Sequence, residues 1–167
     1  MIELLRASTW LYPLVQGVHI FGFIVLAGGA ILFDLRVLGL TSTRAQAPVS
    51  IRALGLHLLP WSVVAALLVV PSGVLMFLVD APALVGNPAF VIKIGLLALV
   101  VGNAAAFHLG PGRAWASWEQ GDTPGQPGSL VPVPAVPAVP AGAKLHAAAS
   151  LFLWIAIVGC GRSIAYV

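Results

Sequence analysis

Four histidines stand out in this chain for their chemistry and their spacing. They are His19, His57, His108 and His146, and each lies in a different long apolar stretch. Ionisable side chains inside a membrane are costly, and they usually face the interior of a helix bundle. Neutral imidazole is also a common axial ligand of haem iron. One such histidine alone is equally well explained as a packing residue, but one in every apolar stretch indicates a haem site.

Depth along the expected helices favours one ligand pair. His57 and His146 both lie about one turn inside the same end of their apolar stretches. The second and fourth helices of an up-down bundle face each other diagonally, so these two side chains can hold an iron between them. We therefore predict His57 and His146 as the metal ligands. His108 lies near the same end, and it is a candidate to replace either ligand or to hydrogen-bond a propionate.

His19 lies toward the opposite end, together with Lys93 and Arg162. Ammonium and guanidinium groups pair with carboxylates, so both cations are candidate partners for porphyrin propionates. His19 would then be the metal ligand of a second site, and the chain would hold one or two haem b groups. The competing interpretation is that Lys93 and Arg162 extend to the lipid headgroups.

The composition requires a membrane domain to position these side chains. Of the 167 residues, 60% are hydrophobic and only 8% are charged, whereas a soluble domain has roughly 25% charged residues. A membrane-spanning helix needs about 20 apolar residues, and four segments qualify: about 13–33, 53–79, 89–109 and 143–164. We predict a single all-α domain over residues 1–167. It would be a four-helix transmembrane bundle, up-down-up-down, with both termini on the same side and a Pro-rich loop at 110–142.

Charged and polar residues define the expected ends of these spans. The first is expected to stop at Phe33, directly before Asp34, and all five acidic residues are placed at span ends or in loops. Pro60 and Pro71 predict a kink or tilt in the second span. Asn103, in the middle of the third, is expected to need a hydrogen-bond partner.

The basic residues predict an orientation in the membrane. They are more numerous in the loops after the first and third spans than near the two termini. Under the positive-inside rule, those loops are cytoplasmic. We therefore expect a multi-pass protein of the bacterial inner membrane whose termini are periplasmic.

Three stretches together resemble known membrane proteins. They are "YPLVQGVHIFGFIVLAGGAILFDLRVLGL", "NPAFVIKIGLLALVVGNAAAFH" and "SLFLWIAIVGCGRSIAY". The chain resembles a family of small four-helix bacterial integral membrane proteins. It is distantly similar to the four-helix membrane protoporphyrinogen IX oxidases and to CopD-like copper-resistance proteins. In those oxidases a first-helix His precedes an Ala-Gly pair, and a third helix carries a Lys followed by a His. Here His19, Ala27-Gly28, Lys93 and His108 match that layout. The resemblance implies b-type haem binding, at which His19 and Lys93 matter most.

The sequence leaves several functions open. The favoured one is a membrane-embedded b-type haem protein that transfers electrons between the quinone pool and a partner protein, as part of a larger redox complex. A porphyrin-oxidising membrane enzyme is the alternative, in which Lys93 or Arg162 would hold substrate carboxylates. A cofactor-free structural or assembly subunit is a second alternative. Copper transport would recruit several Met and Cys ligands, of which the chain has only Met1, Met76 and Cys160. No basic face indicates nucleic acid.

Overall fold

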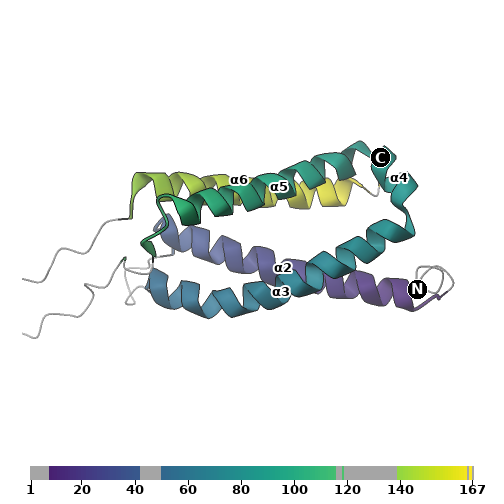
Figure 1. Ribbon diagram of the computed structural model, residues 1–167, viewed down its shortest axis with the longest axis horizontal. Helices are drawn as coiled ribbons and strands as arrows, with labels where there is room; N and C mark the ends of the chain where they lie inside the picture. The colour runs from purple at the N-terminus through teal and green to yellow at the C-terminus, as the bar shows by residue number, and fades with distance from the viewer. Residues whose placement is uncertain (1–7, 42–49, 116–117, 119–138, 165, 167) are drawn as a thin grey trace, which may run out of the picture.

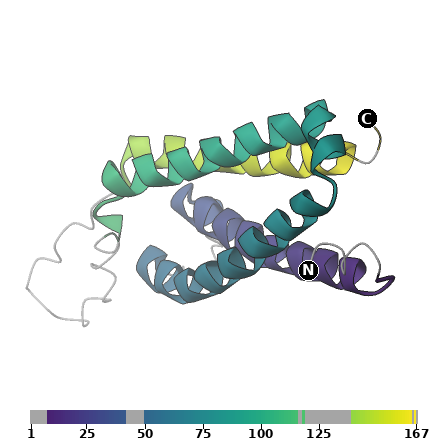
Figure 2. The same cartoon turned by 45° about the vertical axis from the view of Figure 1, so that its right-hand side comes forward.

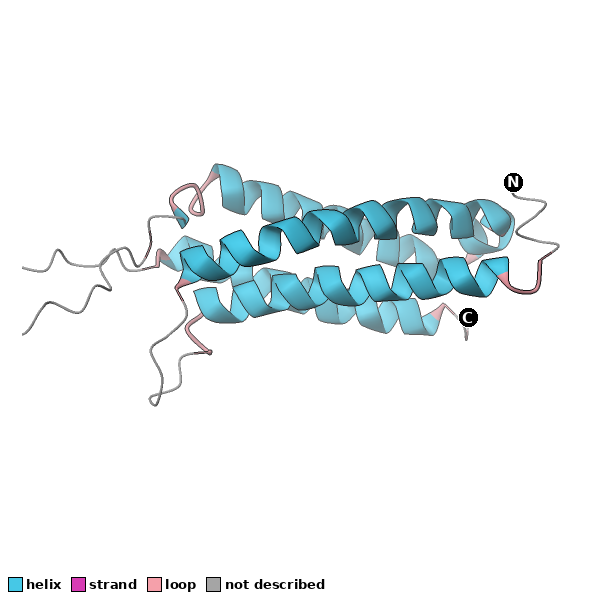
Figure 3. Ribbon diagram, turned by 90° about the horizontal axis from the view of Figure 1, so that it is seen from below, coloured by secondary structure: helices cyan, strands magenta, loops and turns pink. Residues whose placement is uncertain are grey.

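The computed structural model describes residues 8–41, 50–115, 118, 139–164 and 166. Four long helices, α2 (Leu11–Val37), α3 (Ile51–Val79), α5 (Pro88–Leu109) and α6 (Ala141–Ser163), make up most of this part of the chain. A short helix, α4 (Ala81–Gly86), joins α3 to α5. Helices and loops account for the whole of the described part, which contains no strand (Figure 3). Most of the predicted Pro-rich loop lies outside the described residues.

Each of the four long helices is long and apolar enough to cross a membrane. The prediction of an all-helical chain with four membrane-spanning helices is therefore confirmed, and the chain is a multi-pass membrane protein in contact with lipid. Large apolar side chains such as Leu67, Phe152 and Ile155 are exposed on the outer surface. This exposure is unfavourable in water and is expected where the surroundings are lipid tails.

Helix α2 runs past its predicted end. The helix continues four residues past the expected boundary at Phe33, to Val37, and buries both Asp34 and Arg36. Gly39, two residues after the end of the helix, has a φ of 80°. Its N–H donates to the carbonyl of Arg36 at 3.0 Å, and glycine adopts this left-handed conformation without steric cost. The end is thus set by a glycine, and not by the first charged residue.

The next two spans begin at side-chain caps. The hydroxyl of Ser50 accepts from the N–H of Ala53 at 3.0 Å at the start of α3. Asn87 Oδ1 accepts from the N–H groups of Ala89 and Phe90 at the start of α5, at 2.9 and 3.2 Å. Asn87 Nδ2 also donates to the carbonyl of Ile164 at 3.2 Å. The start of α5 is therefore held beside the end of α6.

The four long helices form two pairs. Helix α2 packs against α3, α5 packs against α6, and α2 also packs against α6 (Figures 1 and 2). The backbones of α3 and α5 do not come into contact along their lengths, although Phe77 and Phe90 stack at the corner beside α4. The fourth side of the bundle, between α3 and α5, is therefore open. Pro60 and Pro71 lie within α3, and α3 follows a curved path toward α4 in Figure 2, which agrees with the expected kink or tilt.

The two ends of the bundle differ in their packing. The start of α2 and the end of α6 lie beside α4 (Figure 1), and we call this the α4 end. At the opposite end, which we call the Trp115 end, the ring of Phe33 contacts the rings of Phe107 and Trp115 edge to face. A second buried cluster, around Trp154 and Ala27, fills the seam between α2 and α6. The interior between the two helix pairs is not filled by either cluster.

Candidate ligand-binding cavity

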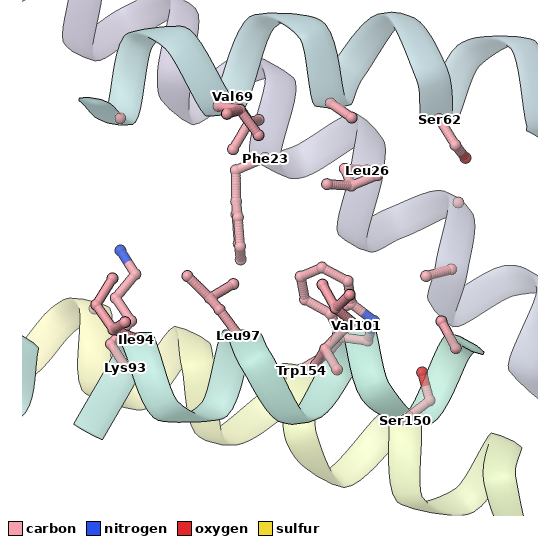
Figure 4. Close-up of a pocket in the computed structure, with 18 of the residues that line it drawn as sticks. Phe23, Leu26, Ser62, Val69, Lys93, Ile94, Leu97, Val101, Ser150 and Trp154 are labelled. Carbon is pink, nitrogen blue, oxygen red and sulfur yellow. The ribbon is translucent and has the colours of Figure 1, made fainter. Parts of the chain in front are cut away.

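A cavity of about 1440 Å³ lies between the two helix pairs, and all four long helices line it. We call it the interhelical cavity (Figure 4). Pockets for drug-sized ligands usually measure about 300–1,000 Å³, so this one has room for a larger ligand. Its walls are mostly apolar, and α3 and α5, which both border it, do not close over it. A ligand dissolved in the bilayer can therefore enter from the side.

His19 lines this cavity toward the α4 end, and α3 fixes its orientation. His19 Nδ1 lies 3.1 Å from the carbonyl oxygen of Val69 and 3.1 Å from the hydroxyl oxygen of Ser72. A carbonyl oxygen can only accept, so Nδ1 carries the hydrogen. The hydroxyl of Ser72 donates in turn to the carbonyl of Leu68. Nε2 of His19 therefore keeps its lone pair, which is the form that binds a metal.

Two glycines allow His19 to reach this position. A Cβ added at Gly73 would lie 3.0 Å from Cε1 of the His19 ring, so glycine leaves the room that the ring occupies. One turn beyond His19 on α2, a Cβ at Gly22 would lie 2.8 Å from Cγ2 of Val69. Close approach of α2 and α3 thus depends on Gly22, and the space for the imidazole depends on Gly73.

Lys93 enters the same end of the cavity from α5. Figure 4 shows its ammonium group pointing into the cavity, toward the α2 and α3 side. The group is near enough to His19 for the two to interact electrostatically. Gly161 of α6 lies beside it, because an added Cβ there would be in ordinary contact with Lys93 Nζ, at 3.7 Å. Lys93 and His19 thus line the same end of one cavity.

A second oriented imidazole lies toward the Trp115 end. His146 Nδ1 is 2.7 Å from Asn103 Oδ1, and Asn103 Nδ2 donates to the backbone carbonyl of His146 at 3.0 Å. The amide oxygen only accepts, so Nδ1 again carries the hydrogen and Nε2 keeps a lone pair. The predicted need of Asn103 for a hydrogen-bond partner is confirmed, and the partner is one of the four histidines.

Asp34 borders the cavity near this second imidazole. It is 8% exposed, Ser150 of α6 lies near its carboxyl group, and Oδ2 has no hydrogen-bond partner among the described residues. Asp34 lies in the last turn of α2, at a span end as expected, but its carboxyl group is buried and borders the cavity. Sequence reasoning missed it because a charged residue at the edge of an apolar run reads as a boundary, whereas here the helix continues past it.

The structure separates the predicted ligand pair. His57 is exposed and lines a different depression, of about 390 Å³, between α2 and α3. His146 lines the interhelical cavity and His57 does not. His108 does line it, although its ring is largely exposed, and the rings of His108 and His146 both contact Phe107, with centroids 5.2 and 6.3 Å away. The structure thus brings His146 near His108 and not near His57.

Arg162 lies outside the interhelical cavity. It is exposed, and its guanidinium carbon is 4.8 Å from the centroid of the Tyr166 ring. A cation over an aromatic ring at a helix end is a common arrangement at a membrane surface. Of the two cations predicted to face a cofactor, the cavity therefore contains Lys93 and not Arg162.

Within the described ranges, no three His, Cys, Asp or Glu side chains come together as a metal site. A haem iron takes four ligands from the porphyrin and needs only one or two imidazoles from the protein, so the oriented rings of His19 and His146 match that requirement better than a site for a bare metal ion.

Comparison with protein-family models, with curated proteins and with solved structures gives no match to this chain.

Proposed function

We propose that this chain is a membrane-embedded b-type haem protein that transfers electrons between the quinone pool and a partner protein, as part of a larger redox complex. The observation that carries the proposal is the α4 end of the interhelical cavity. There His19 is held through Nδ1 and keeps a lone pair on Nε2, while Lys93 supplies an ammonium group.

The side chains at this end fit a haem b group. His19 would bind the iron through Nε2, and the carbonyl of Val69 and the hydroxyl of Ser72 would fix the orientation of its ring. Hydrogen bonds of this kind to the second nitrogen are usual for metal-binding histidines. Lys93 would pair with a propionate. A bound haem b supplies reversible one-electron chemistry at its iron.

His19 replaces His57 and His146 as the favoured ligand in this proposal. The exposed His57 ring borders a different depression from that of His146, so one iron between them would require α3 to rotate. A second haem on His146 is compatible with the free Nε2 that Asn103 leaves there, and His108 is then its nearest imidazole neighbour.

The proposal includes an orientation in the membrane. In this proposal the start of α2 and the end of α6 face the same side of the membrane, and Arg36, Arg52 and Arg113 lie toward the opposite, Trp115 end. By the positive-inside rule, the Trp115 end is cytoplasmic and the α4 end is periplasmic, in a bacterial inner membrane.

Absorption spectra of the purified full chain test the haem proposal. In protein produced with ample haem, a Soret band and sharp reduced α and β bands are expected, and His19→Ala should remove most of this absorbance. The matched control is His57→Ala, which changes an exposed histidine outside the cavity and should leave the spectrum as it is. Wild-type protein without these bands would rule out the proposal, and loss of the bands in His57→Ala alone would refute the choice of ligand.

A porphyrin-oxidising enzyme is the second candidate, and the open side of the cavity favours it. An oxidase for a membrane-dissolved porphyrinogen needs a pocket open to the bilayer and a cation for the substrate carboxylates, and the interhelical cavity offers both through its α3–α5 side and Lys93. Addition of protoporphyrinogen separates the two candidates. If the chain is an oxidase, the wild-type protein should form fluorescent protoporphyrin faster than the Lys93→Met variant does. If neither haem binding nor oxidation is observed, a cofactor-free structural subunit is the better description.

A further inference from the structure

The Trp115 half of the interhelical cavity carries two hydrogen-bond acceptors that the His19 haem site does not use. One is the carboxyl group of Asp34, whose Oδ2 has no partner among the described residues. The other is Nε2 of His146, which keeps a lone pair because Nδ1–H is donated to Asn103. Asp34 and His146 both line this half of the cavity.

The two acceptors line the same part of the cavity from two helices. Asp34 of α2 lies near Ser150 of α6, and Ser150 and His146 are four residues apart on α6. Residues at that spacing are neighbours on one helix face, and all three side chains line the cavity.

The hydrogen-bonding properties of Asp34 and His146 indicate which kind of ligand fits between them. Two acceptors require hydrogen-bond donors, and a buried acceptor without a donor is unfavourable. The walls are otherwise mostly apolar, the Phe107 and Trp154 rings line this part of the cavity, and the gap between α3 and α5 faces lipid. The matching ligand is a lipid-soluble aromatic diol. A quinone has the same ring and tail, but its carbonyls only accept, so they cannot pair with His146 Nε2, and they can pair with Asp34 only when that carboxyl group is protonated.

We propose that the Trp115 half of the cavity is a quinol-binding site, in which one hydroxyl donates to Asp34 and the other to His146 Nε2. The apolar tail leaves through the gap between α3 and α5. This site rests on the proposed function in one respect: a quinol is chosen among lipid-soluble aromatic diols because it carries electrons.

The quinol site and the His19 site lie at different levels of the same cavity. Ser150 and Gly161, which flanks Lys93, are eleven residues apart on α6, which is about 16 Å along the helix. A ligand on Asp34 and His146 therefore leaves the His19 and Lys93 end accessible, and both ligands can be present at once.

The test compares three small molecules on the full chain in lipid nanodiscs: a decyl-substituted benzoquinol, its dimethyl ether and the corresponding quinone. All three share the ring and the tail, but only the quinol has donor hydroxyls. Equilibrium dialysis should show at least tenfold tighter binding of the quinol than of the ether, because two hydrogen bonds are lost in the ether. Asp34→Leu should reduce this preference to within about threefold.

Ser62→Ala is the matched control. Ser62 also lines the cavity, but its hydroxyl donates to the carbonyl of Leu58 on its own helix, so this variant should keep the full preference for quinol. Equal binding of quinol and dimethyl ether by the wild-type protein overturns the site, whether or not any variant folds. An undiminished preference in Asp34→Leu overturns it as well.

Haem absorbance recorded on the same samples separates this inference from the proposed function. If protein without haem bands still prefers quinol, and Asp34→Leu removes that preference, the haem proposal is rejected and the quinol site is supported. Normal haem bands in protein without a quinol preference would reject the site alone.

Discussion

At the residue scale, His19 and His146 are prepared for ligands in the same way. Each donates Nδ1–H to an oxygen, of Val69 for His19 and of Asn103 for His146, and each keeps its Nε2 lone pair. In the sequence, each of the four histidines lies in its own apolar stretch, and none is marked as the ligand. The contacts in the structure distinguish them. His57 is exposed on the outer surface, and no such oriented bond is present for it among the described contacts.

The space for the His19 ring gives a prediction at this scale. Gly73→Ala would place a Cβ 3.0 Å from His19 Cε1, so the ring must move and its bonds to Val69 and Ser72 must lengthen. Since such supporting contacts typically change metal affinity by about 10–100-fold, we expect haem affinity to fall by at least tenfold. A haem titration followed at the Soret band measures this.

Gly28→Ala is the control for that titration, because an added Cβ at Gly28 meets nothing within 4 Å. We expect its haem affinity to match that of the wild type. Equal affinities in all three proteins would show that His19 does not depend on this space, and would argue against its role as the ligand.

At the element scale, α2 is the helix on which the arrangement depends. It packs against both α3 and α6, and it carries His19 toward one end of the cavity and Asp34 toward the other. Its length matters for this reason: a helix that stopped at Phe33 would not hold Asp34 against Ser150. Gly22 lets α2 approach α3 closely, as small residues do between membrane helices.

Gly22→Val tests this close approach. The added side chain would meet Val69, and Ala65 O would lie 3.3 Å from its Cβ, so α2 must move away from α3. Overpacking of this kind costs about 1–3 kcal/mol. Unfolding of the protein in detergent, followed by circular dichroism, should show a lower midpoint than the wild type.

The matched variant is Gly17→Val on the same helix, where an added Cβ meets nothing within 4 Å. Its unfolding midpoint should stay near that of the wild type. A similar loss in both variants would mean that the cost comes from valine in the helix, and not from contact with α3.

At the scale of the whole molecule, the open side between α3 and α5 is the main feature. Three of the four sides of the bundle are closed by helix packing, and the fourth gives the cavity access to lipid. The orientation in the membrane then decides which end of the cavity lies near the cytoplasm.

Labelling of intact bacterial cells tests that orientation. In a Cys160→Ser background, Ser8→Cys at the α4 end should react with a membrane-impermeant maleimide added outside. Leu40→Cys, just after α2 and 70% exposed, should react only after the cells are lysed. The positive-inside rule predicts this pattern because the Trp115 end carries more arginine. The reverse pattern would invert the proposed topology.

Much of the fold was available from the sequence. The four predicted spans match α2, α3, α5 and α6 to within about four residues at each end, because apolar length alone limits what can cross a bilayer. The sequence also indicated that Asn103 needs a partner and that His19 and Lys93 belong together. These predictions depend on composition and on depth along a helix, which a linear sequence contains.

What only the tertiary structure decided is which face of each helix turns inward. The spans are apolar on nearly all sides, because lipid surrounds them and most of the cavity wall is apolar as well, so no polar face marks the interior. Depth placed His57 level with His146, but the rotation of α3 turns His57 away from the cavity that His146 lines. The same rotational freedom left Asp34 undetected as a buried carboxyl group. That rotation is fixed by side-chain contacts between helices, such as Gly22 with Val69 and Asn103 with His146, and these contacts exist only once the helices are assembled.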